Sequence, residues 1–194
     1  NAAERKLLQD YVEQGGLIFA EACDGNGCNG AEFDRTFRAE MEQIFDKPLT
    51  KLPPSHPVWS AETTIDPNGL QEGFWLYGLD ACCRTSVIYA PSSLSCRWEL
   101  ARPWGKIKGA SETAKKDVEN GVKIGINVVA YATGRELKDK LDAVDVVTAP
   151  AQYQPLQRGA LKIAKIQHTG GADDASRAIV NLMDVYYRET KAVV

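Results

Sequence analysis

The feature that most constrains this chain is a helix, a glycine pair and a short apolar strand in immediate succession. Leu8 and Val12 lie on one face of a predicted opening helix, which ends in a left-handed turn at residues 15–16. The apolar run at residues 17–20 is typical of a strand covered on both faces, and it leads into a glycine-rich loop at residues 23–30. A strand of this kind needs helices on both sides of its sheet, so the sequence predicts the α/β class.

The elements that follow continue the alternation of helices and strands. Apolar residues spaced by three and four predict an amphipathic helix that ends before Pro48; they are Phe33, Phe37, Met41, Ile44 and Phe45. Two β-rich runs, residues 73–78 and 84–89, predict a β-hairpin. The order of helix, strand and helix favours a parallel sheet with helices on its faces, to which the hairpin is an excursion.

The second half of the chain predicts one long helix and a later strand-helix pair. The segment around residues 92–105 is predicted to be a lid or excursion, and a long helix is expected from Ser111 to about Gly134. A strand at residues 161–166 and a last helix near residues 178–187 come after a proline-containing connection. We therefore expect a main domain at residues 1–148, and a segment at 149–194 that completes the same sheet or begins a second unit.

Composition excludes several classes of partner. The 194 residues carry a formal charge of −3, with 44% hydrophobic and 25% charged residues and no dense run of Lys or Arg. Nucleic acids and anionic membranes need clustered positive charge, so we expect neither as a partner. No stretch approaches the roughly 18 apolar residues of a membrane span, so we expect no direct membrane insertion. The expected partner is a small ligand, another protein or a neighbouring domain of the same chain.

The five cysteines are Cys23, Cys28, Cys82, Cys83 and Cys96. An odd number is compatible with free thiols or with one or two disulfides. The spacing of Cys23 and Cys28 fits a small disulfide-closed loop and equally two free thiols. Zinc would need two more well-placed ligands, so no metal site and no cofactor are expected.

Several motifs, in this order, carry a family resemblance. The chain resembles the bacterial domain-of-unknown-function family 4159 over roughly residues 4 to 134. The matching segments are YVEQGGLIF at 11–19, FDRTFR at 33–38, LPPSHP at 52–57, RTSVIY at 84–89, WE at 98–99 and GINVVAYA at 125–132. The resemblance implies a class I glutamine amidotransferase-like fold, which is a flavodoxin-like, mostly parallel sheet flanked by helices.

The resemblance also bears on the organisation of the longer protein. Family members usually begin with a strand, a Gly-containing turn and a helix, and here that pattern occurs only near the end, from residue 161 to 187. A tandem arrangement, in which the chain takes the back of one unit and the front of the next, would explain this order. We expect the whole to be an exported or membrane-associated bacterial protein.

Cys23 is the candidate nucleophile. Catalytic amidotransferases keep a cysteine in a Cys-x-Gly turn after an apolar strand, and the triplet at residues 23–25 is similar to it. The carboxyl end of a parallel strand is also where open α/β sheets bind ligands. Those enzymes add a histidine followed two residues later by an acid, a pattern that neither His56 nor His168 shows. A buried or disulfide-bonded Cys23 is the alternative.

The other candidate residues have structural alternatives of their own. His56 is a base, a ligand-binding group or a hydrogen-bonding anchor for its loop, and His168 precedes Gly170 and Gly171, whose amides are suited to an anion. The remaining candidates are Glu21 and Asp24 as metal ligands, as an acid and base pair or as solvated loop residues, and Arg84 and Trp98 as cleft walls or packing residues.

The sequence thus favours a noncatalytic ligand-binding or protein-interaction module on an amidotransferase-like fold. A cysteine-dependent amidase or hydrolase that uses Cys23 with a histidine is the alternative. A structural unit of a tandem array is a third hypothesis.

Overall fold

The chain contains helices and strands that form two compact units. The computed structural model describes residues 1–23, 28–81, 84–101, 110–134, 163 and 177–190. The first unit, here called the sheet unit, comprises Asn1–Ser60 and Thr64–Leu94. The second, the helical unit, comprises Ala61–Thr63 and Ser95–Val194. The predicted boundary after residue 148 lies outside the described residues and stays a prediction.

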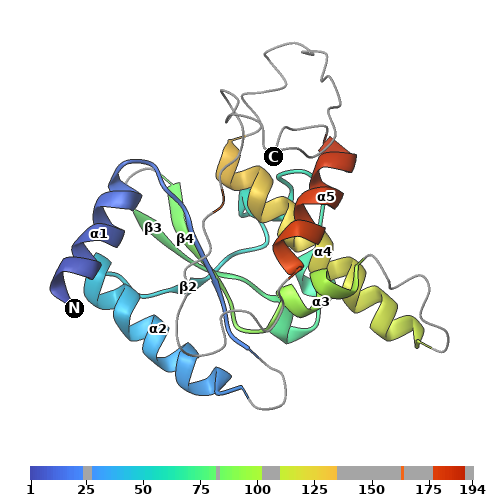
Figure 1. Ribbon diagram of the computed structural model, residues 1–194, viewed down its shortest axis with the longest axis horizontal. Helices are drawn as coiled ribbons and strands as arrows, with labels where there is room; N and C mark the ends of the chain where they lie inside the picture. The colour runs from blue at the N-terminus through green and yellow to red at the C-terminus, as the bar shows by residue number, and fades with distance from the viewer. Residues whose placement is uncertain (24–27, 82–83, 102–109, 135–162, 164–176, 191–194) are drawn as a thin grey trace, which may run out of the picture. The chain divides into compact units, whose positions relative to one another are not determined.

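The sheet unit holds a four-stranded open sheet (Figure 1). Its strands are β1 (Ile18–Glu21), β2 (Thr50–Lys51), β3 (Tyr77–Ala81) and β4 (Arg84–Ala90), in the order β1-β4-β3-β2. Strands β1 and β4 are parallel, whereas β4 pairs with β3 and β3 with β2 in antiparallel fashion.

The pairing confirms the α/β class and does not confirm the mostly parallel sheet. The predicted hairpin is present as β3 and β4, but the sheet is mixed rather than mostly parallel in the described part of the chain. The hairpin strands are integral to the sheet, because β4 is the strand that pairs with β1. The first hairpin run was expected to begin at Gly73, yet Glu72–Phe74 forms a 3₁₀ turn and β3 begins only at Tyr77.

Helix α2 (Gly30–Phe45) covers one face of this sheet. Its apolar residues recur every three or four positions, so they share one face of the helix. That face packs on a core formed by alternate residues of the strands, including Val87 and Tyr89 of β4, both fully buried. The core cluster comprises Ala22, Met41, Leu49, Leu79, Val87 and Tyr89.

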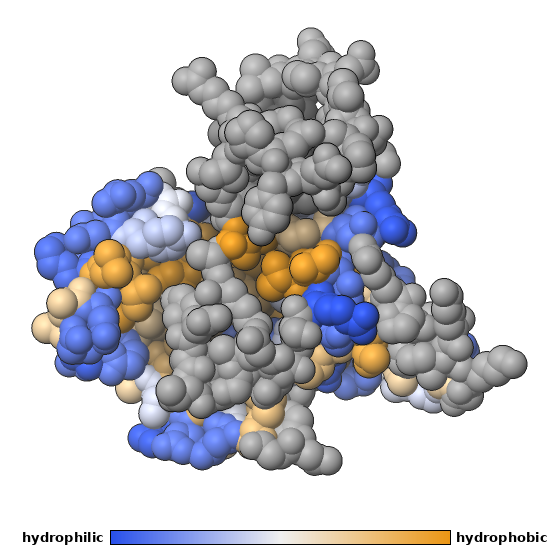
Figure 2. All heavy atoms as spheres, in the orientation of Figure 1, coloured by the Kyte–Doolittle hydropathy of each residue, from blue (hydrophilic) through white to orange (hydrophobic). Residues whose placement is uncertain are grey.

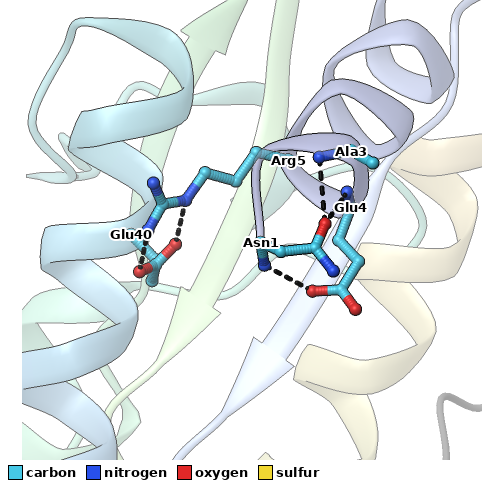
Figure 3. A network of polar contacts seen from close by, with 5 residues as sticks. All are labelled: Asn1, Ala3, Glu4, Arg5 and Glu40. Atoms are coloured by element: carbon cyan, nitrogen blue, oxygen red, sulfur yellow. Dashed lines mark hydrogen bonds and ion pairs between the residues drawn. The ribbon is translucent and has the colours of Figure 1, made fainter.

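Helix α1 (Ala2–Glu13) packs beside α2 and is joined to it by an ion pair. The Arg5 guanidinium donates to both oxygens of Glu40, at 2.8 and 2.7 Å (Figure 3). The side chain of Asn1 caps α1 by accepting hydrogen bonds from the amides of Ala3 and Glu4. In Figure 2 hydrophilic residues make up most of the visible surface around α1, at the left of the view.

The helical unit is built around α4 (Glu112–Thr133), which Ser111 caps and Gly134 ends in a left-handed conformation. Helices α3 (Ser95–Leu100) and α5 (Ala178–Thr190) pack against α4 and against each other (Figure 1). Trp98 of α3 donates a hydrogen bond from Nε1 to the carbonyl oxygen of Gly121, 2.8 Å away. The lack of a side chain at Gly125 lets α3 and α5 approach α4 closely.

A buried asparagine ties the segment Ala61–Thr63 to α4. The Asn127 side chain is only 1% exposed. Its Oδ1 accepts from the amides of Glu62 and Thr63 at 3.1 and 2.8 Å, and its Nδ2 donates to the Thr63 carbonyl oxygen at 2.7 Å. The amide group therefore pairs with three backbone groups of this segment, as buried polar side chains generally do.

The helix predictions hold where the structure describes the chain. Helices α1, α2, α4 and α5 occur where periodicity predicts them. The expected lid or excursion at residues 92–105 contains helix α3, which packs into the helical unit. The predicted strand at 161–166 lies outside the described residues apart from Ile163.

Candidate functional site

A cleft of about 520 Å³ lies at the carboxyl ends of the parallel strands β1 and β4. Pro91 directly follows β4 and Cys23 follows β1 by two residues, and both line it. The first turns of α2 contribute Gly30, Ala31, Asp34 and Arg38 to the lining. Open α/β sheets place their ligands at this end of parallel strands. The lining residues are Cys23, Cys28, Gly30, Ala31, Asp34, Arg38 and Pro91.

Cys23 and Cys28 form a disulfide at one wall of the cleft. Their Cα atoms are 5.7 Å apart, a separation typical of a bridge. A side chain at Gly30 would overlap the Cys23 carbonyl oxygen, so glycine is required at the first residue of α2. A sulfur in a disulfide is not a thiolate, and Cys23 would have to be reduced before it could act as a nucleophile.

Asp34 and Arg38 lie one helical turn apart on α2 and share a polar cluster with two tyrosines. Asp34 Oδ1 accepts hydrogen bonds from Tyr89 Oη at 2.8 Å and from Arg38 Nε at 3.0 Å. The Arg38 guanidinium carbon is 4.2 Å from the ring centre of Tyr77 and 5.2 Å from that of Tyr89. Burial raises the pKa of Tyr89 strongly, and the hydrogen bond to Asp34 adds to this effect.

Glu21 ends β1 and binds the chain that follows β4. Its Oε2 accepts a hydrogen bond from the Leu94 amide at 3.0 Å. This hydrogen bond links the end of β1 to the segment between β4 and α3. Asp24, its predicted partner in an acid pair, lies outside the described residues.

The His56 side chain forms a hydrogen bond with Thr85, near the amino end of β4. Its Nδ1 accepts a hydrogen bond from the Val58 amide at 3.1 Å, so the ring carries its proton on Nε2, which is 2.9 Å from Thr85 Oγ1. Thr85 in turn donates to Asp80 Oδ1 at 2.5 Å. Burial lowers the pKa of His56, and the nearby Asp80 charge opposes this shift.

The structure does not bring His56 to Cys23. Thr85 precedes Ala90 by five residues, and Ala90 is the partner of Glu21 at the carboxyl end of β1. Five strand residues span about 16 Å at about 3.3 Å each. A general base must come within hydrogen-bond reach, directly or through one water. This histidine therefore lies too far along the sheet to activate the cysteine in this arrangement.

Two of the other predicted site residues have structural contacts in the described part of the chain. Arg84 begins β4, at the end opposite to Glu21, and donates from Nη2 to the Gly15 carbonyl oxygen at 2.6 Å. Trp98 belongs to the helical unit and is buried there. His168, Gly170 and Gly171 lie outside the described residues. In the ranges that the structure describes, no group of three or more His, Cys, Asp or Glu side chains is placed to hold a metal.

Asp34 and Arg38 were missed as candidates by the sequence reasoning. Both lie within the FDRTFR segment, and their spacing of four places them on the same side of a helix. An acid and an arginine at this spacing usually form a solvated surface pair. The stacking on Tyr77 and Tyr89 distinguishes this pair, and it depends on strand pairing that spacing alone does not give.

An open mixed sheet flanked by helices, with a cleft at the ends of its parallel pair, defines an α/β protein. The chain belongs to the family described as Domain of unknown function (DUF4159), which matches residues 1–133. No curated protein and no solved structure shows a significant match to the chain. Among the described helices, none has the length and apolar character needed to cross a membrane.

Proposed function

We propose that this chain is a noncatalytic module that binds a small ligand in the cleft at the carboxyl ends of β1 and β4. The observation that carries the proposal is the position of the cleft, about 520 Å³ in volume, at the ends of the parallel pair. Ligand clefts in proteins typically measure roughly 300–1,000 Å³. The charged side chains of Asp34 and Arg38 line the cleft, which suits a ligand that is oriented by hydrogen bonds.

Two features support binding without catalysis. The sulfur of Cys23 is engaged in a disulfide with Cys28, and His56 uses its ring nitrogens to hold its own loop against β4. Cys23 is the nucleophile that an amidase would use, and His56 is one of its two candidate bases. Their arrangement favours structural roles for both.

The placement of the sheet unit with amidotransferase-like folds is part of the same proposal. The parallel pair β1 and β4, with its cleft at the carboxyl ends, is the part of such a fold that the described residues share. The flavodoxin-like, mostly parallel sheet would require further parallel strands beyond this pair.

Blocking the cleft tests the proposal. Ala31 lines the cleft and is exposed, so Ala31→Trp should fill it with little effect on folding. Ala39 is also exposed on α2 but does not line the cleft, which makes Ala39→Trp a matched control. A library of small fragments is screened by ¹⁵N–¹H NMR against the 194-residue chain in non-reducing buffer.

We expect fragments that shift the amides of Gly30 and Ala31 in the unmodified chain and in Ala39→Trp, but not in Ala31→Trp. Circular dichroism confirms that each variant is folded. Fragments that bind equally well to Ala31→Trp, or a library that leaves the cleft amides unshifted, would refute the proposed site.

A further inference from the structure

Arg38 is the cationic side chain that lines the cleft, and the sheet below it holds it in place. Tyr77 and Tyr89 are directly paired across β3 and β4, so their rings are neighbours on the face covered by α2. The guanidinium carbon lies within 4.2 and 5.2 Å of the two ring centres. Cation–π contacts at this range stabilise the guanidinium and limit its rotation.

Asp34 fixes one edge of the guanidinium and leaves the other one available. Within the described part of the chain, the Arg38 side chain donates its hydrogen bond from Nε to Asp34 Oδ1. The hydrogen bond from Tyr89 Oη to the same oxygen orients the carboxylate. Arg38 retains its Nη1–Nη2 edge, whose two parallel N–H groups match two oxygens of a carboxylate or phosphate.

Solvent reaches this pair. The side chains of Arg38 and Asp34 are 30% and 35% exposed, and both line the cleft. A buried pair would be closed to ligands, and a fully exposed arginine would lose conformational entropy on binding. A half-buried arginine stacked on two rings avoids most of this entropic cost.

We propose that the Nη1–Nη2 edge of Arg38 binds an oxyanion of the cleft ligand, either a carboxylate or a phosphate group. This inference rests on the proposed ligand-binding function and specifies the chemistry of its ligand. Asp34 positions Arg38, and its charge lowers the net positive potential of the site. Affinity for a simple anion is therefore modest, and the rest of the ligand supplies the remaining contacts.

The test is a titration of the ¹⁵N-labelled 194-residue chain with sodium acetate and, separately, with sodium phosphate, at constant ionic strength set with sodium chloride. The variant Arg38→Gln removes the guanidinium, and Arg38→Lys keeps the charge but loses the paired N–H groups. Arg35→Gln is the control, because Arg35 is exposed on the same helix, does not line the cleft and carries the same charge.

We expect acetate or phosphate to shift the amides around Arg38 and Ala31, and Arg38→Gln to weaken that binding about tenfold or more, as for loss of a charged hydrogen bond. Arg38→Lys should weaken it severalfold, and Arg35→Gln should stay within about twofold. Thermal melts show which variants are folded, and Arg38→Lys decides the outcome if Arg38→Gln is unfolded. A preference for acetate over phosphate, or the reverse, identifies the group.

The outcomes separate this inference from the proposed function. If neutral fragments bind the cleft while neither anion does, the ligand class is wrong and the ligand-binding function stands. Equal losses for Arg35→Gln and Arg38→Gln would show nonspecific charge attraction and would overturn the assignment of Arg38. If neither fragments nor anions shift the cleft amides, both proposals are refuted.

Discussion

Replacement of Gly125 by alanine sets two opposing effects against each other in the helical unit. Alanine in the middle of a helix is favoured over glycine by about 1 kcal/mol. A Cβ at residue 125, however, would lie 2.8 Å from Cδ1 of Leu182 and 2.8 Å from ring atoms of Trp98. The Trp98 ring is 3% exposed and held by its hydrogen bond to Gly121, so it has little room to move.

Overpacking of a core costs about 1–3 kcal/mol, which outweighs the gain in helix propensity. We therefore expect Gly125→Ala to lower the free energy of unfolding by about 1 kcal/mol, and Gly125→Val to lower it further. Urea unfolding followed by circular dichroism measures this difference, with Lys116→Ala on the exposed side of α4 as the control. A Gly125→Ala protein more stable than the parent would show that the close packing of α3, α4 and α5 is wrong.

Four further predictions concern single interactions. Asn127→Leu removes three hydrogen bonds at a buried position and should lower the free energy of unfolding by about 3 kcal/mol, measured by urea unfolding; a loss under about 1 kcal/mol would contradict the bonding described. Burial lowers the pKa of His56 in the folded protein, so the neutral imidazole contributes stability that is present above pH 6.5, its ordinary pKa, and is lost as pH falls through the folded pKa. Thermal melts from about pH 7.5 to about pH 5 should show this loss of stability, and the His56→Gln variant should lose less over the same range. The hydrogen bond from Arg5 lowers the pKa of Glu40, so NMR titration of the Glu40 carboxyl should give a midpoint below its ordinary value, and Arg5→Gln should return it there. Reduction of Cys23–Cys28 should destabilise the sheet unit by about 2 kcal/mol, and a reduced protein with unchanged urea midpoint would argue against a formed bridge.

The elements that the sequence predicted well are those with a local cause. Helix α4 begins after Ser111 and ends at Gly134, because a cap and a left-handed glycine act within one turn of the helix. The periodic apolar residues of α2 likewise identify its buried face without reference to any partner.

The features that depend on pairing across the chain were not accessible in this way. A strand pattern does not identify a partner that is distant in the sequence, and so the parallel pairing of β4 with β1 and the two-residue β2 were not foreseen, although the hairpin of β3 and β4 was. Helix α3 has only six residues, too few to show a period, and its packing on α4 depends on Trp98 and Gly121. Of the candidate site, the position of Cys23 at a strand end was predictable. The stacking of Arg38 required the cross-strand pair Tyr77 and Tyr89.

The most direct test of the account locates a bound fragment in the cleft at the ends of β1 and β4. Intermolecular nuclear Overhauser effects are measured between a fragment from the screen and the 194-residue chain. The account predicts contacts from the fragment to the Ala31 methyl group and to the α protons of Gly30, both of which line the cleft. Contacts confined to residues that do not line it, such as the exposed Leu7 on α1, would contradict a ligand site at the strand ends.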